Sequence, residues 1–138
     1  MTCFIDTSVV RYAGGADHPY RAACRAVMRQ VADETLDAVT SAEVVQEIQH
    51  RCARGHHRAG AQMARSVLGL FSEVLPIDRR TIAGAVAIYE DHPHLSARDA
   101  LHVATCVTND IADIVSVDAG FDEATEVRRI DPRDLLKP

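Results

Sequence analysis

The segment Thr2–Ser8, TCFIDTS, decides how this chain is organised. Its apolar run ends abruptly in the carboxylate of Asp6 and two hydroxyls, a pattern typical of a buried strand that delivers polar groups to the rim of a sheet. Open α/β sheets place their chemistry at that rim, beyond the carboxyl ends of the strands. Asp6 is therefore the first candidate catalytic residue, although an aspartate at such a position is also a common cap of the following turn.

A near copy of this pattern lies towards the other end of the chain. Residues 114–118, IVSVD, form a β-branched run that ends in Asp118, and Asp122 follows one turn later. The run predicts a second strand that presents an acid at its carboxyl end.

Two further acids each follow a hydroxyl residue by three positions. Glu43 ends the segment TSAE, which begins at Thr40, and Asp99 ends the segment SARD, which begins at Ser96. This is the spacing of a capping box, so each segment predicts a helix start with the acid in the first turn.

The rest of the chain alternates short apolar runs with amphipathic segments. Further strands are predicted at 36–39, 75–77 and 127–130. Helices are predicted from Pro19 (capped by Asp17 or His18) to about 31, and over 40–55, 57–74, 78–92 and 96–107, with a short helical turn at 9–12. This alternation within 138 residues predicts one α/β domain, 1–138, with a mostly parallel sheet of about five strands.

Composition limits the possible functions. No apolar stretch is long enough for a membrane span or a signal peptide, and the four scattered cysteines lack a C-x-x-C pair, so we expect a soluble, cytoplasmic protein with reduced thiols. The net charge of −5 argues against binding nucleic acid by general phosphate attraction. It does not exclude nucleic acid, because bound divalent cations would invert the charge of a carboxylate site.

If the strands are parallel, four acids share one end of the sheet: Asp6, Glu43, Asp99 and Asp118. Two such charges 4 Å apart repel by about 1 kcal/mol in water and about 4 kcal/mol at an effective dielectric near 20, so a cation is expected among them. The only lysine is Lys137 in the tail, and we expect no histidine base in these motifs. Oxygen ligands alone favour Mg²⁺ or Mn²⁺ over zinc and suit phosphoryl substrates.

Two other aspartate-based classes fit less well. A phosphoacceptor receiver domain needs a lysine near its site, and Lys137 lies in the tail. A phosphatase with an aspartyl nucleophile needs a second carboxylate two residues after Asp6, where this chain has Ser8.

Four segments, in order, resemble the PIN domains, and specifically the VapC ribonuclease toxins of bacterial toxin–antitoxin pairs. They are FIDTS at 4–8, TSAE at 40–43, SARDALH at 96–102 and SVDAGFD at 116–122, and together they span nearly the whole chain. Ser8 stands where many members carry asparagine, and Ser116 where threonine is common, but both substitutions keep a polar group.

The resemblance implies a three-layer α/β/α fold and a metal-dependent endoribonuclease that leaves 5′-phosphate and 3′-hydroxyl ends. The implied catalytic residues are Asp6, Glu43, Asp99, Asp118 and Ser116. The implied ligands of one or two Mg²⁺ or Mn²⁺ ions are the same four acids, with Asp122 as an outer carboxylate.

The resemblance also implies partners: a second copy of the chain, an RNA substrate such as tRNA or rRNA, and a VapB-like antitoxin whose C-terminal segment covers the acidic groove. Candidate RNA contacts are Arg51, Arg54, Arg58 and Arg98. The first three belong to a basic stretch that is equally consistent with a solvated helix hairpin. Two other functions stay open, a catalytically degenerate PIN domain that only binds, and a nuclease directed at DNA.

Overall fold

A parallel sheet forms the centre of the computed structural model, which describes residues 1–53 and 55–136. Within these residues the sheet has five strands in the order β3-β2-β1-β4-β5, and each neighbouring pair is parallel. The strands are β1 (Cys3–Ile5), β2 (Ala38–Ser41), β3 (Val74–Leu75), β4 (Asp113–Val115) and β5 (Arg128–Ile130). The predicted mostly parallel sheet of about five strands is confirmed.

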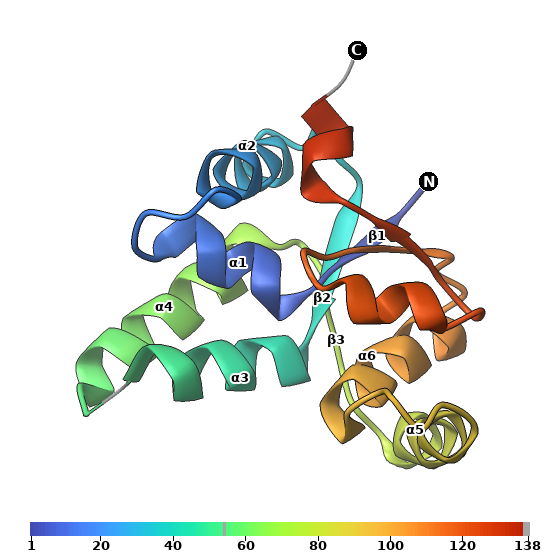
Figure 1. Ribbon diagram of the computed structural model, residues 1–138. Helices are drawn as coiled ribbons and strands as arrows, with labels where there is room; N and C mark the ends of the chain where they lie inside the picture. The colour runs from blue at the N-terminus through green and yellow to red at the C-terminus, as the bar shows by residue number, and fades with distance from the viewer. Residues whose placement is uncertain (54, 137–138) are drawn as a thin grey trace.

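Helices cover both faces of this sheet (Figure 1). They are α1 (Thr7–Gly14), α2 (Arg21–Ala32), α3 (Ala42–Ala53), α4 (His57–Leu70), α5 (Arg79–Asp91) and α6 (Ala97–Thr108), with 3₁₀ helices η1 (Ala119–Glu123) and η2 (Pro132–Leu136). The chain steps from β1 to β2 to β3 in one direction and then back to β4. Because parallel crossovers are right-handed, α1 to α4 cover one face, and α5 and α6 cover the other. None of the described helices is long and apolar enough to cross a membrane.

The two central strands are the most deeply buried part of the chain. Phe4 and Ile5 of β1 and Ile114 and Val115 of β4 are fully buried. A strand covered on both faces needs a continuous apolar run, which explains why these segments do not alternate with polar residues. Beyond the carboxyl ends of these strands, polar residues follow at once, at Asp6 and Ser116.

The start of α3 differs from the prediction by one residue. Thr40 belongs to β2, and its hydroxyl donates to the carbonyl of Ile5 at 3.0 Å. The cap is Ser41, whose Oγ accepts from the amide of Val44 at 3.2 Å. The capping box predicted for Thr40 and Glu43 is therefore wrong, because β2 continues through Ser41 to pair with β3.

Other helix starts gave mixed results. The predicted caps Asp78 and Ser96 are confirmed, since their side chains accept from the amides of Thr81 and Asp99. The predicted start at Pro19 is wrong. Instead, His18 accepts from the amide of Tyr20 through Nδ1, and α2 begins at Arg21.

Segment ends also moved by a few residues. The first helix is longer than the predicted turn at 9–12, because Asp6 caps it and it runs from Thr7 to Gly14. The helix predicted over 57–74 ends at Leu70, because the chain must extend to pair Val74 with β2.

Gly60 allows α4 to approach α3 closely. A Cβ placed on Gly60 would lie 2.6 Å from the carbonyl oxygen of Gln49 and 3.0 Å from the Cβ of Ala53. We predict that Gly60→Ala destabilises the fold by about 1–3 kcal/mol, because the two helix backbones must separate. Urea unfolding curves measure this change.

The matched control is Gly69→Ala on the same helix, where an added Cβ meets nothing within 4 Å. It should be neutral or stabilising by up to about 1 kcal/mol, because alanine has the higher helix propensity. Equal unfolding free energies for the two variants would contradict the close approach.

Candidate active site

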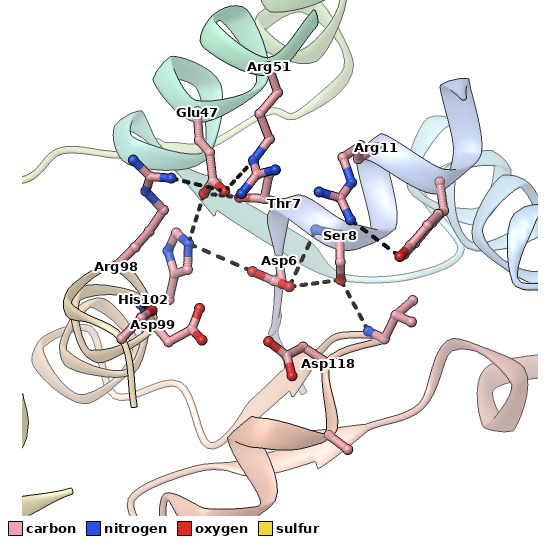
Figure 2. Close-up of a pocket in the computed structure, with 14 residues that line it drawn as sticks. Asp6, Thr7, Ser8, Arg11, Glu47, Arg51, Arg98, Asp99, His102 and Asp118 are labelled. Atoms are coloured by element: carbon pink, nitrogen blue, oxygen red, sulfur yellow. Dashed lines mark hydrogen bonds and ion pairs between the residues drawn. The ribbon is translucent and has the colours of Figure 1, made fainter. Parts of the chain in front are cut away.

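The carboxyl ends of β1 and β4 open into a cavity of about 580 Å³. These two strands are the point at which the strand order reverses, the usual position of a ligand site in an open α/β sheet. Four carboxylates from four segments line this acidic cavity (Figure 2): Asp6, Glu47, Asp99 and Asp118.

Hydroxyl groups from both strand ends fix Asp6. Its Oδ2 accepts from Ser116 Oγ at 2.7 Å and from Ser8 Oγ at 2.8 Å. The amide of Ser8 donates to the same oxygen at 3.3 Å as the cap of α1. Asp6 is therefore both a helix cap and a buried wall of the cavity, so the capping role that its sequence position suggested does not remove it from the candidate site.

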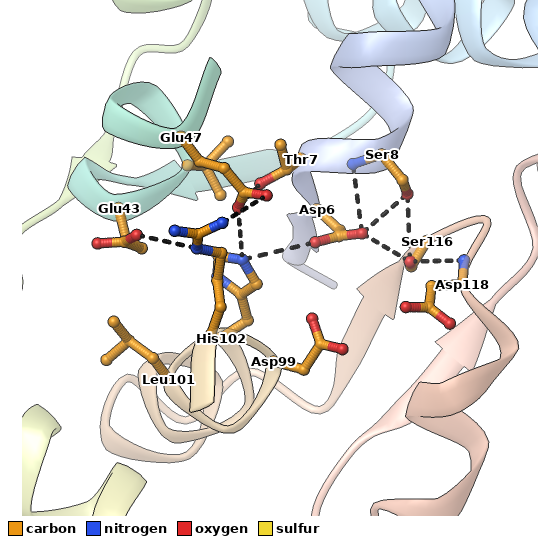
Figure 3. Close-up of polar contacts among 12 residues, drawn as sticks. Asp6, Thr7, Ser8, Glu43, Glu47, Asp99, Leu101, His102, Ser116 and Asp118 are labelled. Atoms are coloured by element: carbon orange, nitrogen blue, oxygen red, sulfur yellow. Dashed lines mark hydrogen bonds and ion pairs between the residues drawn. The ribbon is translucent and has the colours of Figure 1, made fainter. Parts of the chain in front are cut away.

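The same two serines connect the β1 and β4 loops. Ser8 Oγ accepts from the amide of Val117 at 3.1 Å, and Ser116 Oγ accepts from the amide of Asp118 at 3.0 Å. Asp118 also caps η1 by accepting from the amide of Gly120 at 2.8 Å. This network holds the carboxylates of Asp6 and Asp118 on the same side of the sheet (Figure 3).

Asp99 reaches the cavity from the first turn of α6. The hydroxyl of Ser96 caps its amide at 3.0 Å, and its carboxylate points towards Asp6 and Asp118 (Figure 3). Burial, together with the negative charges of Asp6 and Asp118, raises the pKa of Asp99 to about 6. The three aspartates thus form a site with excess negative charge.

Glu43 does not line this cavity, whereas Glu47, one turn further along α3, does. Glu43 lies at the rim with Oε1 3.5 Å from Arg98 Nε. Glu47 was not predicted, because the capping-box spacing from Thr40 points to Glu43. Helical spacing places Glu43 and Glu47 on one helix face, but it does not show which of the two reaches the site.

Glu47 differs from the three aspartates because its charge is fully compensated. It accepts from Thr7 Oγ1 at 2.8 Å and Arg51 Nε at 3.0 Å, and it lies 3.4 Å from His102 Nε2 and 3.5 Å from Arg98 Nη1. Burial would raise its pKa, but the hydrogen bonds from His102 and Thr7 outweigh burial and lower it to about 2.

His102 is the second residue lining the cavity that was not predicted as a site residue, although it ends the motif SARDALH. It is fully buried on α6, one turn after Asp99, with Nε2 3.7 Å from Asp6 Oδ1. Burial lowers its pKa, but Glu47 and Asp6 outweigh that effect, and the pKa is raised. The Nε2 atom of His102 therefore lies between the carboxylates of Asp6 and Glu47.

The other predicted site residues occupy different surroundings. Asp122 lies outside the acidic cavity, ion-paired with Arg129 at 2.9 Å. Arg51 and Arg98 line the cavity, and Arg58 is exposed on the first turn of α4. Arg54 lies outside the described residues.

Comparisons with known proteins agree with this geometry. The family profile of the PIN domain matches residues 3–127. The chain belongs to the PIN-domain family. Ribonuclease VapC13 of Mycobacterium tuberculosis is 35% identical over 127 residues, which cover 91% of this chain and 97% of VapC13. The VapC type inferred from the four motifs is confirmed by this similarity.

Solved structures share the fold. Mycobacterium tuberculosis VapC20, described as a sarcin–ricin loop cleaving toxin, superposes with a TM-score of 0.74 at 24% identity, covering 91% of this chain and 98% of that one. A toxin–antitoxin complex from Klebsiella pneumoniae gives a TM-score of 0.69 at 15% identity, with 94% and 97% covered. The PIN-like α/β/α fold is therefore confirmed.

The donor set of this PIN domain suits a hard divalent cation. Asp6, Asp99 and Asp118 offer only oxygen ligands, and no arginine or lysine of the described residues forms an ion pair with them. Within residues 1–53 and 55–136, no group of three or more histidine, cysteine or acidic side chains is already close enough to hold a metal ion. A Mg²⁺ ion that keeps several of its waters fits such an open set.

The charge of Asp99 predicts how stability of the metal-free PIN domain depends on pH. Its pKa is raised to about 6 in the folded chain, so between about pH 4 and 6 the folded state binds more protons than the unfolded state. Stability from this group therefore falls as pH rises through that range and stays low above it. Asp99→Asn should raise the unfolding free energy at pH 7 by on the order of 1–2 kcal/mol after solvent screening.

The measurement is thermal or urea unfolding in excess EDTA at pH 4 and pH 7. The gain should shrink towards zero at pH 4, where wild-type Asp99 is already neutral. A loss of stability in Asp99→Asn at pH 7 would show that the carboxylate holds the helix rather than opposing other charges.

Proposed function

We propose that this PIN domain is a metal-dependent endoribonuclease toxin. The observation that supports the proposal is the convergence of Asp6, Asp99 and Asp118 at the strand-order reversal, without an arginine or lysine partner among the described residues. Three neighbouring carboxylates repel one another, and a bound metal ion would offset that repulsion. Their oxygen ligands suit a hard divalent cation.

Asp6, Asp99 and Asp118 would hold Mg²⁺ or Mn²⁺. When bound, the ion would lower the pKa of a water and offset charge that develops on the phosphodiester. Ser116 and Ser8 fix the orientation of Asp6 through two short hydrogen bonds. That fixed orientation reduces the rearrangement needed when the charge of the site changes.

The proposed reaction is hydrolysis of an RNA phosphodiester. The oxygen of water bonds to phosphorus, the bond from phosphorus to the 3′-oxygen breaks, and the leaving 3′-oxygen takes up a proton. The products carry a 5′-phosphate and a 3′-hydroxyl. Support for RNA comes from the relatives, which are named ribonucleases, and a tRNA or rRNA substrate is consistent with the structural neighbour that cleaves the sarcin–ricin loop.

Purified protein should cleave RNA with Mg²⁺ or Mn²⁺ and stop in excess EDTA. Mapping 5′ ends of total cellular RNA after brief expression identifies the target, and a synthetic oligonucleotide of that sequence then measures the rate. Asp6→Asn and Asp99→Asn should each lose at least 100-fold in kcat, a loss typical of groups that stabilise charge in a transition state. Undiminished cleavage in EDTA would overturn metal dependence.

Other outcomes of the same assay address the alternatives. Absence of cleavage with intact RNA binding would favour a catalytically degenerate binding module, and preferred cleavage of DNA of the same sequence would favour a DNA nuclease. Glu47→Gln should reduce cleavage far more than Glu43→Gln, because only Glu47 lines the acidic cavity. The reverse order would restore the role that the sequence assigned to Glu43.

We also propose a VapB-like antitoxin as partner, supported by the toxin–antitoxin complexes among the structural neighbours. Its C-terminal segment would cover the acidic cavity, and a guanidinium group from it would pair with the uncompensated carboxylates. Co-expression should suppress the cleavage described above. Suppression that survives truncation of that segment would count against this mode of inhibition.

A homodimer through α5 is proposed from an exposed apolar stripe. Ile82, Val86 and Tyr89 share one helix face and are 46%, 55% and 51% exposed. Arg79 and Glu90 flank this stripe at opposite ends of the helix. In a two-fold antiparallel pairing of α5 with its copy, each Arg79 would meet the Glu90 of the other chain, so the surface is self-complementary in shape and charge.

Val86→Asp should convert the dimer to a monomer, because it places a charge at the centre of the apolar stripe. Light scattering coupled to size-exclusion chromatography measures the mass. Leu68→Asp on α4 is the control, since Leu68 is equally exposed at 52% but lies outside the stripe. A wild-type monomer at tens of micromolar, or a Val86→Asp dimer, would contradict this interface.

A further inference from the structure

A second cavity, of about 590 Å³, adjoins the acidic one. The described residues that line it are His50, Arg51, Ala53, Gly55 and Arg98, and none of them is acidic. We call it the basic cavity. Arg51 and Arg98 also line the acidic cavity, so these two guanidinium groups stand where the two cavities meet.

The buried carboxylate of Glu47 contacts both arginines. Glu47 contacts Arg51 Nε at 3.0 Å and Arg98 Nη1 at 3.5 Å (Figure 2). Glu43 contacts Arg98 Nε at 3.5 Å. The two arginine side chains nevertheless remain 40% and 43% exposed. They are therefore positioned by the protein and still open to a ligand.

Neutralisation of Glu47 alone does not explain this arrangement. The buried carboxylate of Glu47 already accepts from the Thr7 hydroxyl at 2.8 Å and lies 3.4 Å from His102 Nε2. Arg51 contacts it through Nε only, which leaves the two terminal nitrogens free to donate elsewhere. Arg98 lies beside both Glu47 and Glu43, yet its side chain is still 43% exposed. The outward donors of the two arginines can therefore bind an anion that enters from solvent.

We propose that Arg51 and Arg98 form a phosphate clamp, which binds a backbone phosphate of the RNA strand beside the phosphate that is cleaved. The inference rests on the proposed ribonuclease function and names where its substrate is held. In a chain of net charge −5 with three aspartates gathered in the site, a polyanion needs a local source of attraction. The planar guanidinium fork suits phosphate oxygens, and its prior fixation by Glu47 reduces the entropy lost on binding.

The test measures binding without cleavage. Fluorescence anisotropy of a 12-nucleotide single-stranded RNA is recorded in excess EDTA at several salt concentrations. Arg51→Gln and Arg98→Gln should each weaken binding about 5- to 50-fold and reduce the slope of log affinity against log salt by about 0.7 per lost phosphate contact. Arg80→Gln, an exposed arginine on α5, is the control with the same change of net charge and should bind like wild type.

Lysine variants keep the experiment decisive if a glutamine variant fails to fold. Arg98→Lys retains the charge beside Glu47, so the salt dependence of RNA binding should be unchanged. Its RNA affinity should fall, because lysine lacks the bidentate fork of a guanidinium group. In the cleavage assay, Arg98→Gln should raise KM more than it lowers kcat, whereas Asp99→Asn lowers kcat.

The outcomes separate this proposal from the ribonuclease proposal. If the wild-type protein binds RNA through the two arginines but does not cleave it, the phosphate clamp is supported and the ribonuclease proposal is contradicted. If the wild-type protein cleaves RNA, but Arg51→Gln and Arg98→Gln bind RNA with the same affinity as Arg80→Gln, only the phosphate clamp is contradicted. Normal RNA affinity together with lost antitoxin binding would assign the basic cavity to the protein partner and overturn the proposal.

Discussion

The hydrogen bond from Ser116 to Asp6 is the contact on which the site depends. It is buried, 2.7 Å long, and joins residues 110 positions apart at the ends of the two central strands. Such a bond forms only if β1 and β4 are neighbours in parallel and in register, because both strands must end at the same level. The parallel register of β1 and β4 therefore also sets the position of Asp6, the first catalytic candidate. A shift in the register of β4 would separate Asp6 from Asp118.

The acids around this hydrogen bond have different charged neighbours. Glu47 has two arginines, a histidine and a hydroxyl, and its lowered pKa reflects them. Asp99 has other carboxylates instead, and its pKa is raised. The buried Glu47 and the half-buried Asp99 therefore have opposite electrostatic surroundings in one cavity. We infer that the side with Glu47 is organised to hold cationic side chains, while the side with the three aspartates is organised to receive a cation.

Much of this arrangement could be predicted from the sequence, because it depends on local patterns. The strands that end in Asp6 and Asp118, and the cap at Ser96 that sets Asp99, follow from periodicity and capping chemistry. Glu47 could not be found in that way. Thr40 and Ser41 are both adequate caps, and the choice between them is made by β3, whose pairing extends β2 through Ser41. That pairing joins segments more than thirty residues apart and has no local signal.

His102 is a second residue whose place in the site could not be predicted from local sequence patterns. Its spacing from Asp99 places the two residues on one helix face, but a histidine on such a face is usually a surface or core residue. Only the convergence of α3, α6 and β1 supplies Glu47 and Asp6 as partners for its Nε2 atom. Burial lowers the pKa of His102, and its two acidic neighbours raise it more strongly. The Nε2 atom of His102 lies 3.7 Å from Asp6 Oδ1. An ion or guanidinium group must therefore approach Asp6 from the side of Asp99 and Asp118, where no arginine or lysine of the described residues forms an ion pair.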